Sequence, residues 1–455
     1  MMLRRTTTPD DESPNTGSQD TGRRLASNRP ISGGKDGRPY DRAFWCAYVA
    51  NLSIMISVSL LFRYSDFVTL LGGSERHLGW IVGVGTFGSI AIQLAQGAGI
   101  DQFGARKIWM VSLVLVGASL AAHLLVRHVE GPMIYAVRIL YHCSLGGMIA
   151  AQFTYVSQRA PKGRVAEVLG MMGSSGFIGV ILGSQLGDVL CSVGPLQRWH
   201  LDRVFLAAAF FSLVSLVSVS FSARDVATVV RCRRLPLVWI IRRYHPGRLM
   251  VMAIAMGIGV NLPATFLRPF TEHLDIGRIG TFFTTYAVTA FFARLATRRL
   301  SQRIGIPTTV ILGMSLLCCS MLLYLLVRSP WHLVMPAFAA GFAHALLFPS
   351  IVAGGGGTFP ARHRGVGMTL ILSVCGVGNL VGMPLAGCIV DYAPLMDLPP
   401  YRMMFLTMAG LIALATAFYI LYPQKIVKKR PVISSPVKSP EPDKETLADM
   451  ANAIV

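Results

Sequence analysis

The chain contains little charge for its length. Asp, Glu, Lys and Arg make up 14% of its 455 residues, whereas hydrophobic residues make up 53%. A water-soluble globular chain usually carries about 25% charged residues, so this chain has too little polar surface to cover itself in water. The shortage of charge excludes an ordinary soluble domain and indicates a protein that is solvated by lipid.

The chain also lacks the motifs of metal, cofactor and nucleotide chemistry. Its eight cysteines form no CxxC pair and no metal spacing with histidine, which argues against a zinc site or a disulfide framework. The glycines of 83–88 match a dinucleotide fingerprint, but they lie inside an apolar segment with no preceding strand. We find no phosphate loop, no Ser/His/Asp set and no paired carboxylates. We therefore expect no enzyme, no metal and no cofactor.

What the sequence does contain is two sets of six long apolar segments. Each segment is close to or above the ~20 residues that a helix needs to cross a bilayer, and only helices satisfy their backbone groups within one segment in lipid. The segments lie near 43–70, 78–97, 108–126, 132–155, 166–189 and 203–222, and then near 249–271, 279–297, 308–327, 331–353, 366–390 and 402–422.

These segments predict an all-α membrane protein with twelve transmembrane helices in two six-helix bundles. The bundles cover 42–222 and 249–422, and a basic connector, 223–248, joins them. Residues 1–41 and 423–455 are polar and are predicted to be disordered tails. The first of these tails has no apolar run and so does not match a secretory signal.

The positive charge is distributed unevenly between the two sides of the predicted membrane. The net charge is +20, and 32 of the 42 Lys and Arg residues lie in the tails, the connector and the loops on their side. This bias predicts that both termini and the connector are cytoplasmic. We expect a multi-pass protein of the plasma (inner) membrane, a monomer, whose partners are the lipid bilayer and a small-molecule solute rather than nucleic acid.

A glycine pattern repeats between the two halves of the chain. Gly79 precedes Gly104 by 25 residues, and Gly280 precedes Gly305 by the same interval. In each half the second glycine ends a polar loop between two apolar segments. A repeat in register indicates that the two bundles arose by duplication and are pseudo-symmetric.

The first of these loops carries a more specific pattern, Gly97-x-x-x-Asp101-x-x-Gly104-x-Arg106. It resembles the signature between helices 2 and 3 of the major facilitator superfamily, and the resemblance extends over 42–422. The resemblance implies a secondary transporter in which this loop latches the cytoplasmic side. The implied gate residues are Gly97, Asp101, Gly104 and Arg106, with Gln302 and Gly305 in a weaker second copy.

Three arginines lie inside the predicted spans at similar depth, on helices that line the central cavity in the superfamily. They are Arg63, Arg138 and Arg268. Ionisable residues in a bilayer are expensive, so a functional role is the first hypothesis. They could capture an anionic or polyhydroxylated solute. Alternatively, Asp66 and Glu272 neutralise Arg63 and Arg268 along their own helices, which would make these pairs gates and the two acids candidates for proton coupling.

Nearer the middle of the membrane lie further candidates for solute contact, His142, His344 and Asn261. Pro263 is expected to break the seventh helix and expose backbone carbonyls there. The functional prediction is proton-coupled efflux of a sugar-like or drug-like compound by alternating access. Two alternatives stay open: uptake or exchange of an organic anion, and a sensor that keeps the fold without transporting.

Overall fold

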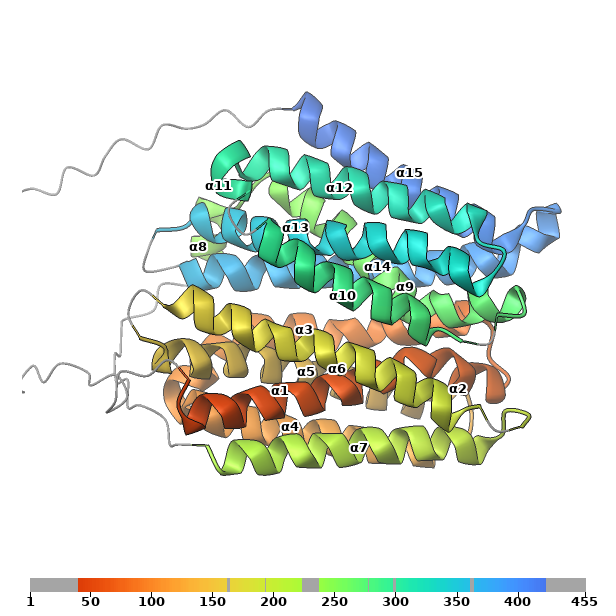
Figure 1. The fold of residues 1–455 in the computed structure, drawn as a ribbon, viewed down its shortest axis with the longest axis horizontal. Helices are drawn as coiled ribbons and strands as arrows, with labels where there is room; N and C mark the ends of the chain where they lie inside the picture. The colour runs from red at the N-terminus through yellow and green to blue at the C-terminus, as the bar shows by residue number, and fades with distance from the viewer. Residues whose placement is uncertain are drawn as a thin grey trace, which may run out of the picture.

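The computed structural model describes residues 40–161, 164–192, 194–222, 237–276, 278–297, 300–360 and 364–422. Within these ranges every regular element is a helix (Figure 1). Most of the connector, 223–236, lies outside the described residues. So do the predicted tails, apart from Tyr40 and Asp41.

The first half contains six spans. The first span is made of three consecutive pieces, and the third ends in a short 3-10 turn. The elements are α1 (Arg42–Leu60), η1 (Leu61–Arg63), α2 (Tyr64–Leu70), α3 (Glu75–Phe103), α4 (Ala105–Ala122), η2 (His123–Leu125), α5 (Pro132–Arg159), α6 (Val165–Leu190) and α7 (Arg198–Ser220).

A short helix, α8 (Leu237–Tyr244), precedes the second half, which also contains six spans. Its elements are α9 (Leu249–His273), α10 (Gly280–Ala296), α11 (Leu300–Ile304), α12 (Ile306–Leu323), η3 (Tyr324–Leu326), η4 (Pro330–Leu333), α13 (Val334–Gly357), α14 (Arg364–Tyr392), η6 (Ala393–Met396) and α15 (Pro400–Leu421).

The predicted fold class is confirmed. Among the described residues, eleven helices are long and apolar enough to cross a membrane. The remaining predicted span corresponds to α10, which has 17 residues. The hydrophobic lengths in the sequence therefore correspond to helices, although α3 continues beyond the predicted 78–97 as far as Phe103.

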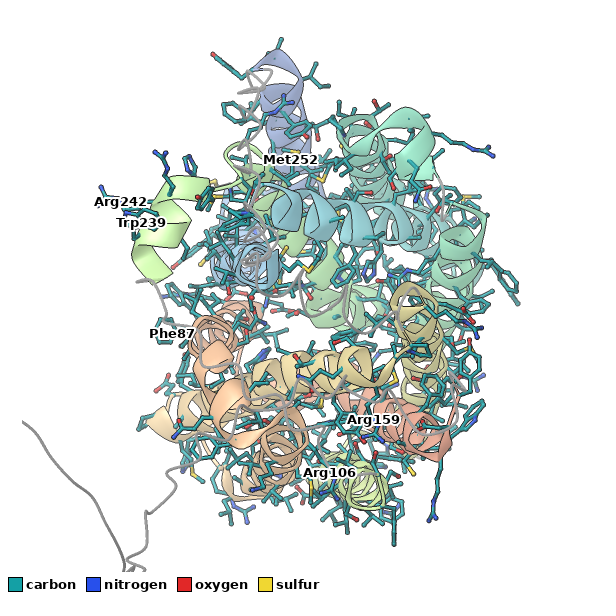
Figure 2. All side chains as sticks on the ribbon, turned by 90° about the vertical axis from the view of Figure 1, so that its left-hand side faces the viewer. Phe87, Arg106, Arg159, Trp239, Arg242 and Met252 are labelled. Carbon is teal, nitrogen blue, oxygen red and sulfur yellow. The ribbon has the colours of Figure 1, made fainter. Side chains whose placement is uncertain are left out.

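The two halves lie side by side with their helices along the long axis of the molecule (Figure 1). The chain enters α1 and leaves α15 at the same end, which also carries α8; we call this the terminal end. The turns after α2 and after α9 lie at the opposite end, which we call the far end. Figure 2 views the terminal end and shows Trp239 and Arg242 of α8 at the edge of the second half.

The duplication is visible in the backbone. Gly104 and Gly305 have φ angles of +87° and +83°, and each is the N-cap of the third span of its half. Such angles favour glycine because it has no Cβ. The third span of each half also ends in a 3-10 turn, η2 or η3. Equivalent residues therefore adopt equivalent conformations in the two bundles.

The halves meet mainly along two helix pairs, α3 with α14 and α6 with α10, and α9 adds smaller contacts with η1, α2 and α3. At the first seam the backbones approach closely because α3 carries glycines there. A methyl group on Gly79 would lie 2.3 Å from the Met383 carbonyl oxygen, and one on Gly83 would lie 2.6 Å from the Pro384 ring. This seam leaves no room for larger side chains at these two positions.

Candidate functional site

Buried charges form a connected set at the far end. The guanidinium of Arg63 donates to Asp66 Oδ2 and to Asp188 Oδ1, both at 2.9 Å. The exposed fractions of the three side chains are 5%, 1% and 8%. At this burial an ion pair is screened little by solvent, and losing one partner leaves a charge uncompensated. We call Arg63, Asp66, Asp188 and Arg268 the far-end ion network.

The network connects the two halves through both of its carboxylates. Arg268 of α9 donates from Nε to Asp66 Oδ1 at 2.9 Å. Asp188 Oδ2 accepts the backbone N–H groups of Ile279 and Gly280, at 3.1 and 2.8 Å. Those groups form the start of α10, where a helix has unsatisfied N–H donors and a positive dipole end. Each carboxylate is thus bonded to residues of both bundles.

The local fold explains why these side chains converge. The 3-10 turn η1 interrupts the first span at Arg63, and Asp66 follows three residues later on the same side of the chain. Glu272, the other predicted acid, lies at the edge of the network. Its Oε2 is 3.8 Å from Arg268 Nη2, and its side chain is 56% exposed. Arg268 therefore pairs more closely with Asp66 than with Glu272, its neighbour along α9.

Further polar contacts close the far end around the network. Arg76 at the start of α3 donates to the Tyr392 hydroxyl at 2.9 Å, and the Tyr401 hydroxyl donates to Glu75 at 2.8 Å. Between α6 and α10, Gln185 donates to Thr284 at 3.1 Å. In this conformation the two halves are therefore held together at the far end.

Arg138 lies apart from the other two predicted arginines. Its guanidinium carbon is 4.1 Å from the ring centre of Tyr64 and 5.2 Å from that of Tyr141, an aromatic environment within the first half. Its side chain is buried, and its Nε and Nη1 have no hydrogen-bond partner among the described residues. The same holds for Nε2 of His142, one turn further along α5.

The mid-membrane candidates occupy two different settings. The His344 ring nitrogen Nδ1 is hydrogen-bonded to the Tyr286 hydroxyl, which joins α13 to α10. Asn261 donates to the Gly257 carbonyl at 2.8 Å, within its own helix. The expected break at Pro263 is wrong, because α9 is continuous from Leu249 to His273. The surrounding residues are buried, and their packing holds the helix together across the proline.

The predicted gate residues lie near the terminal end. Arg106 donates to the carbonyl oxygens of Val219 and Ser220 at 3.3 and 2.6 Å, at the C-terminal end of α7. This contact complements the negative end of a helix dipole. Gln302 is exposed on α11. Gly97 and Asp101 belong to α3, but the Asp101 side chain and the surroundings of Gly97 lie outside the described part of the structure.

Sequence reasoning missed two charged residues in the spans, Asp188 and Arg294. Asp188 lies inside the predicted segment 166–189, so an acid within an apolar run was the available signal. Arg294 lies inside 279–297, but it was counted with the basic loop that follows. Both residues face the seam between α6 and α10.

The comparisons with known proteins agree on one fold. The model of the Major Facilitator Superfamily matches residues 43–277 and 248–448. A mutant of the nucleoside transporter NupG superposes with a TM-score of 0.72 at 12% identity, over 84% of this chain and 99% of that one.

Two further structures are similar. A bacterial homologue of the human lysosomal transporter Spinster, inward-facing and unoccupied, has a TM-score of 0.66 at 13% identity, over 86% and 97% of the two chains. The human organic anion transporter MFSD10 has a TM-score of 0.61 at 17% identity, over 83% and 99%. The search of curated protein sequences gave no match.

Proposed function

Because the chain belongs to the Major Facilitator Superfamily, we propose that it is a proton-coupled secondary transporter whose outer gate is the far-end ion network. The superfamily makes it a membrane transporter and not an enzyme. One observation carries the proposal: Asp66 and Asp188 are buried and each is bonded to both halves. Transporters of this architecture work by rocking one half against the other.

The proposed orientation places the terminal end in the cytoplasm. The bias of Lys and Arg supports this, as does the exposed Arg242 of α8 at that end (Figure 2). The far end then faces the outside, and the conformation with an intact network is closed to the outside. The predicted latch residues around Gly104 and Arg106 lie at the cytoplasmic end in this orientation.

Protons would act on the two carboxylates. A proton on Asp188 removes its negative charge and one of its acceptor sites, which weakens its bonds to Arg63 and to the start of α10. The same change on Asp66 weakens its bond to Arg268. Protonation from the outside therefore favours separation of the halves there. Release of the proton to the cytoplasm lets the network form again, so that proton movement drives the cycle.

The charges in the interior favour an anionic solute over the sugar-like or drug-like compound expected first. Among the described residues, the interior holds four arginines and two buried acids. The arginines are Arg63, Arg138, Arg268 and Arg294, and the acids are Asp66 and Asp188. The excess of positive charge suits an anion, and one of the similar structures is an organic anion transporter.

Labelling of a cysteine at the far end tests the gate. In a variant without native cysteines, Thr284→Cys places a thiol beside Gln185, and an impermeant maleimide is added from outside. We expect slow labelling at neutral pH, faster labelling at low external pH, and fast labelling at either pH after Asp188→Asn. The matched control is Asp202→Asn, which removes a half-exposed ion pair within α7. Equal, slow labelling of the Thr284→Cys protein alone, with Asp188→Asn and with Asp202→Asn would refute the gate.

Flux in proteoliposomes separates a transporter from a sensor. With a pH dye inside and phthalate as the test anion, a coupled transporter gives a proton signal that depends on phthalate. The Asp188→Asn variant should lose this signal. A protein that binds anions without any movement of solute or protons would instead be the non-transporting sensor.

A further inference from the structure

The seam between α6 and α10 contains a guanidinium that has no counter-ion among the described residues. Arg294 has no ion pair and no hydrogen bond with any described residue, and its Nε atom is buried. The side chain is partly buried, and a cation that is partly withdrawn from water without a counter-ion is unfavourable. Inside a membrane such a residue is rare, and its first interpretation is functional.

Arg294 faces the interior of the protein and not the lipid. A helix turns by about 100° per residue, which places Ala287 and Ala290 on the same side as Arg294. Both alanines are fully buried, whereas Val288 and Phe292 on the opposite side are 41% and 61% exposed. The side chain therefore lies between α10 and the first half, against α6.

The opposite wall of the seam is formed by glycines and one aromatic ring. The guanidinium carbon of Arg294 is 5.2 Å from the ring centre of Phe177 on α6. A methyl group on Gly173 would lie 3.4 Å from Arg294 Nη1 and within 4 Å of nothing else, and one on Gly170 would meet nothing. Among the described residues, no other side chain packs on the α6 surface beside this guanidinium.

The same seam is tightly closed at the far end. A methyl group on Gly280 would lie 2.9 Å from Asp188 Oδ2 and 2.9 Å from Gln185. Helices α6 and α10 therefore form a wedge, which is closed by Asp188 at one end and open beside Arg294 towards the terminal end. On α6, Gly170, Gly173, Phe177 and Asp188 all lie on the side that faces α10.

We propose that Arg294 and Phe177 form the binding site for an organic oxyanion, with the charged group on Arg294 and a flat apolar body on Phe177. A guanidinium presents parallel N–H donors that match a carboxylate or a phosphate. The ring of Phe177 offers a face for stacking. This inference rests on the proposed function and deepens it, because the wedge is open to the cytoplasm when the far-end ion network is formed.

Binding to purified protein in detergent tests the site. The ligands are benzoate, phenyl phosphate and the neutral benzamide, measured by calorimetry. We expect at least one of the two anions to bind. Benzamide should bind at least about tenfold more weakly than that anion, because it lacks the charge. The variant Arg294→Gln should reduce anion affinity about tenfold or more, and Arg294→Lys should reduce it less. Arg303→Gln, on the exposed α11, is the matched control and should change nothing.

A second variant keeps the test decisive if Arg294→Gln does not fold. Gly173→Leu fills the space in front of the guanidinium and should abolish anion binding, whereas Gly170→Ala should leave it intact. The site is refuted if no anion binds, if benzamide binds as well as the anions, or if affinity survives in both Arg294→Gln and Gly173→Leu.

The test also separates this site from the gate. Binding in detergent needs no proton gradient, so Asp188→Asn should alter far-end labelling and still bind the anion. If far-end labelling changes with Asp188→Asn as expected but no anion binds, only the site is refuted. Anion binding without the labelling effects would refute only the gate.

Discussion

The two seams between the halves occupy equivalent places in the duplicated fold, yet they differ in chemistry. Arg294 follows Gln93 by 201 residues, the interval that also separates Gly79 from Gly280. In the α3–α14 seam, Gln93 Oε1 accepts a neutral hydrogen bond from Ser373 at 3.3 Å. In the α6–α10 seam the equivalent position carries a guanidinium that no described residue pairs. Duplication therefore produced the same geometry twice, and at this position only one of the two copies is charged.

The seams also differ in how far they are closed. Along α3–α14, glycines bring the helices together from the far end, where a methyl group on Gly387 would lie 2.3 Å from the Glu75 carbonyl, through Gly79 and Gly83. The close approach continues to Gly376, where a methyl group would lie 2.8 Å from the Ile90 side chain. Along α6–α10 the tight contact is confined to the far end. We infer that the first seam serves as a hinge and the second as the surface that opens and binds.

The largest expected effect is on the charged seam. Asp188→Ala removes one of the two carboxylate partners of Arg63 and the acceptor of two helix N–H groups, and should destabilise the protein by about 3 kcal/mol, as for other broken buried pairs. Asp202→Ala, which breaks a partly exposed pair, should cost about 1 kcal/mol or less. Unfolding in detergent measures both. Equal losses would mean that the far-end ion network adds nothing beyond a surface pair.

The next largest effect is expected from a larger side chain in the α3–α14 seam. Gly79→Ala places a methyl group 2.3 Å from a backbone oxygen, so that α3 and α14 must separate. We expect this overpacking to destabilise the protein by about 1–3 kcal/mol. Gly173→Ala meets only the flexible end of Arg294, at 3.4 Å, and should change stability by less than about 0.5 kcal/mol. Thermal unfolding compares the two variants. A similar loss in both would show that the α6 surface is as tightly packed as α3.

The sequence was sufficient for the fold because the signals for it are local. The lengths of the apolar runs, the positions of Lys and Arg and the glycine spacing each depend on a few neighbouring residues. The paired conformations of Gly104 and Gly305 confirm that the repeat extends to single residues. The predicted break at Pro263 was wrong because buried neighbours along α9 outweigh the local preference of a proline.

The candidate site was less predictable because its contacts join distant residues. Spacing along a helix suggested Asp66 as the ion-pair partner of Arg63, and the structure contains this pair. It suggested Glu272 as the partner of Arg268, but that contact is long, at 3.8 Å. The closer partner of Arg268, Asp66, lies 202 residues away. No periodicity encodes such a pair, and only the docking of the two bundles brings its members together.

A smaller effect on stability is expected when the repeated glycine is replaced in either half. Gly104 and Gly305 have the same positive-φ conformation, in which an L-residue is strained. Gly104→Ala and Gly305→Ala should therefore each destabilise by about 1 kcal/mol. Thermal unfolding of the two variants side by side measures this. A large loss in one half alone would show that the two loops have diverged in their contacts as well as in their sequence.

The smallest effect is expected at the neutral counterpart of Arg294. Ser373→Ala removes the hydroxyl that donates to Gln93, but Gln93 is only partly buried, so its amide can be solvated. The loss should be about 0.5–1 kcal/mol in unfolding, with benzoate affinity unchanged. The reason is that this seam contributes a hydrogen bond to the hinge and no charge to the ligand. If Ser373→Ala reduced benzoate affinity as much as Arg294→Gln, the two seams would share one function, and the difference in charge between them would have another cause.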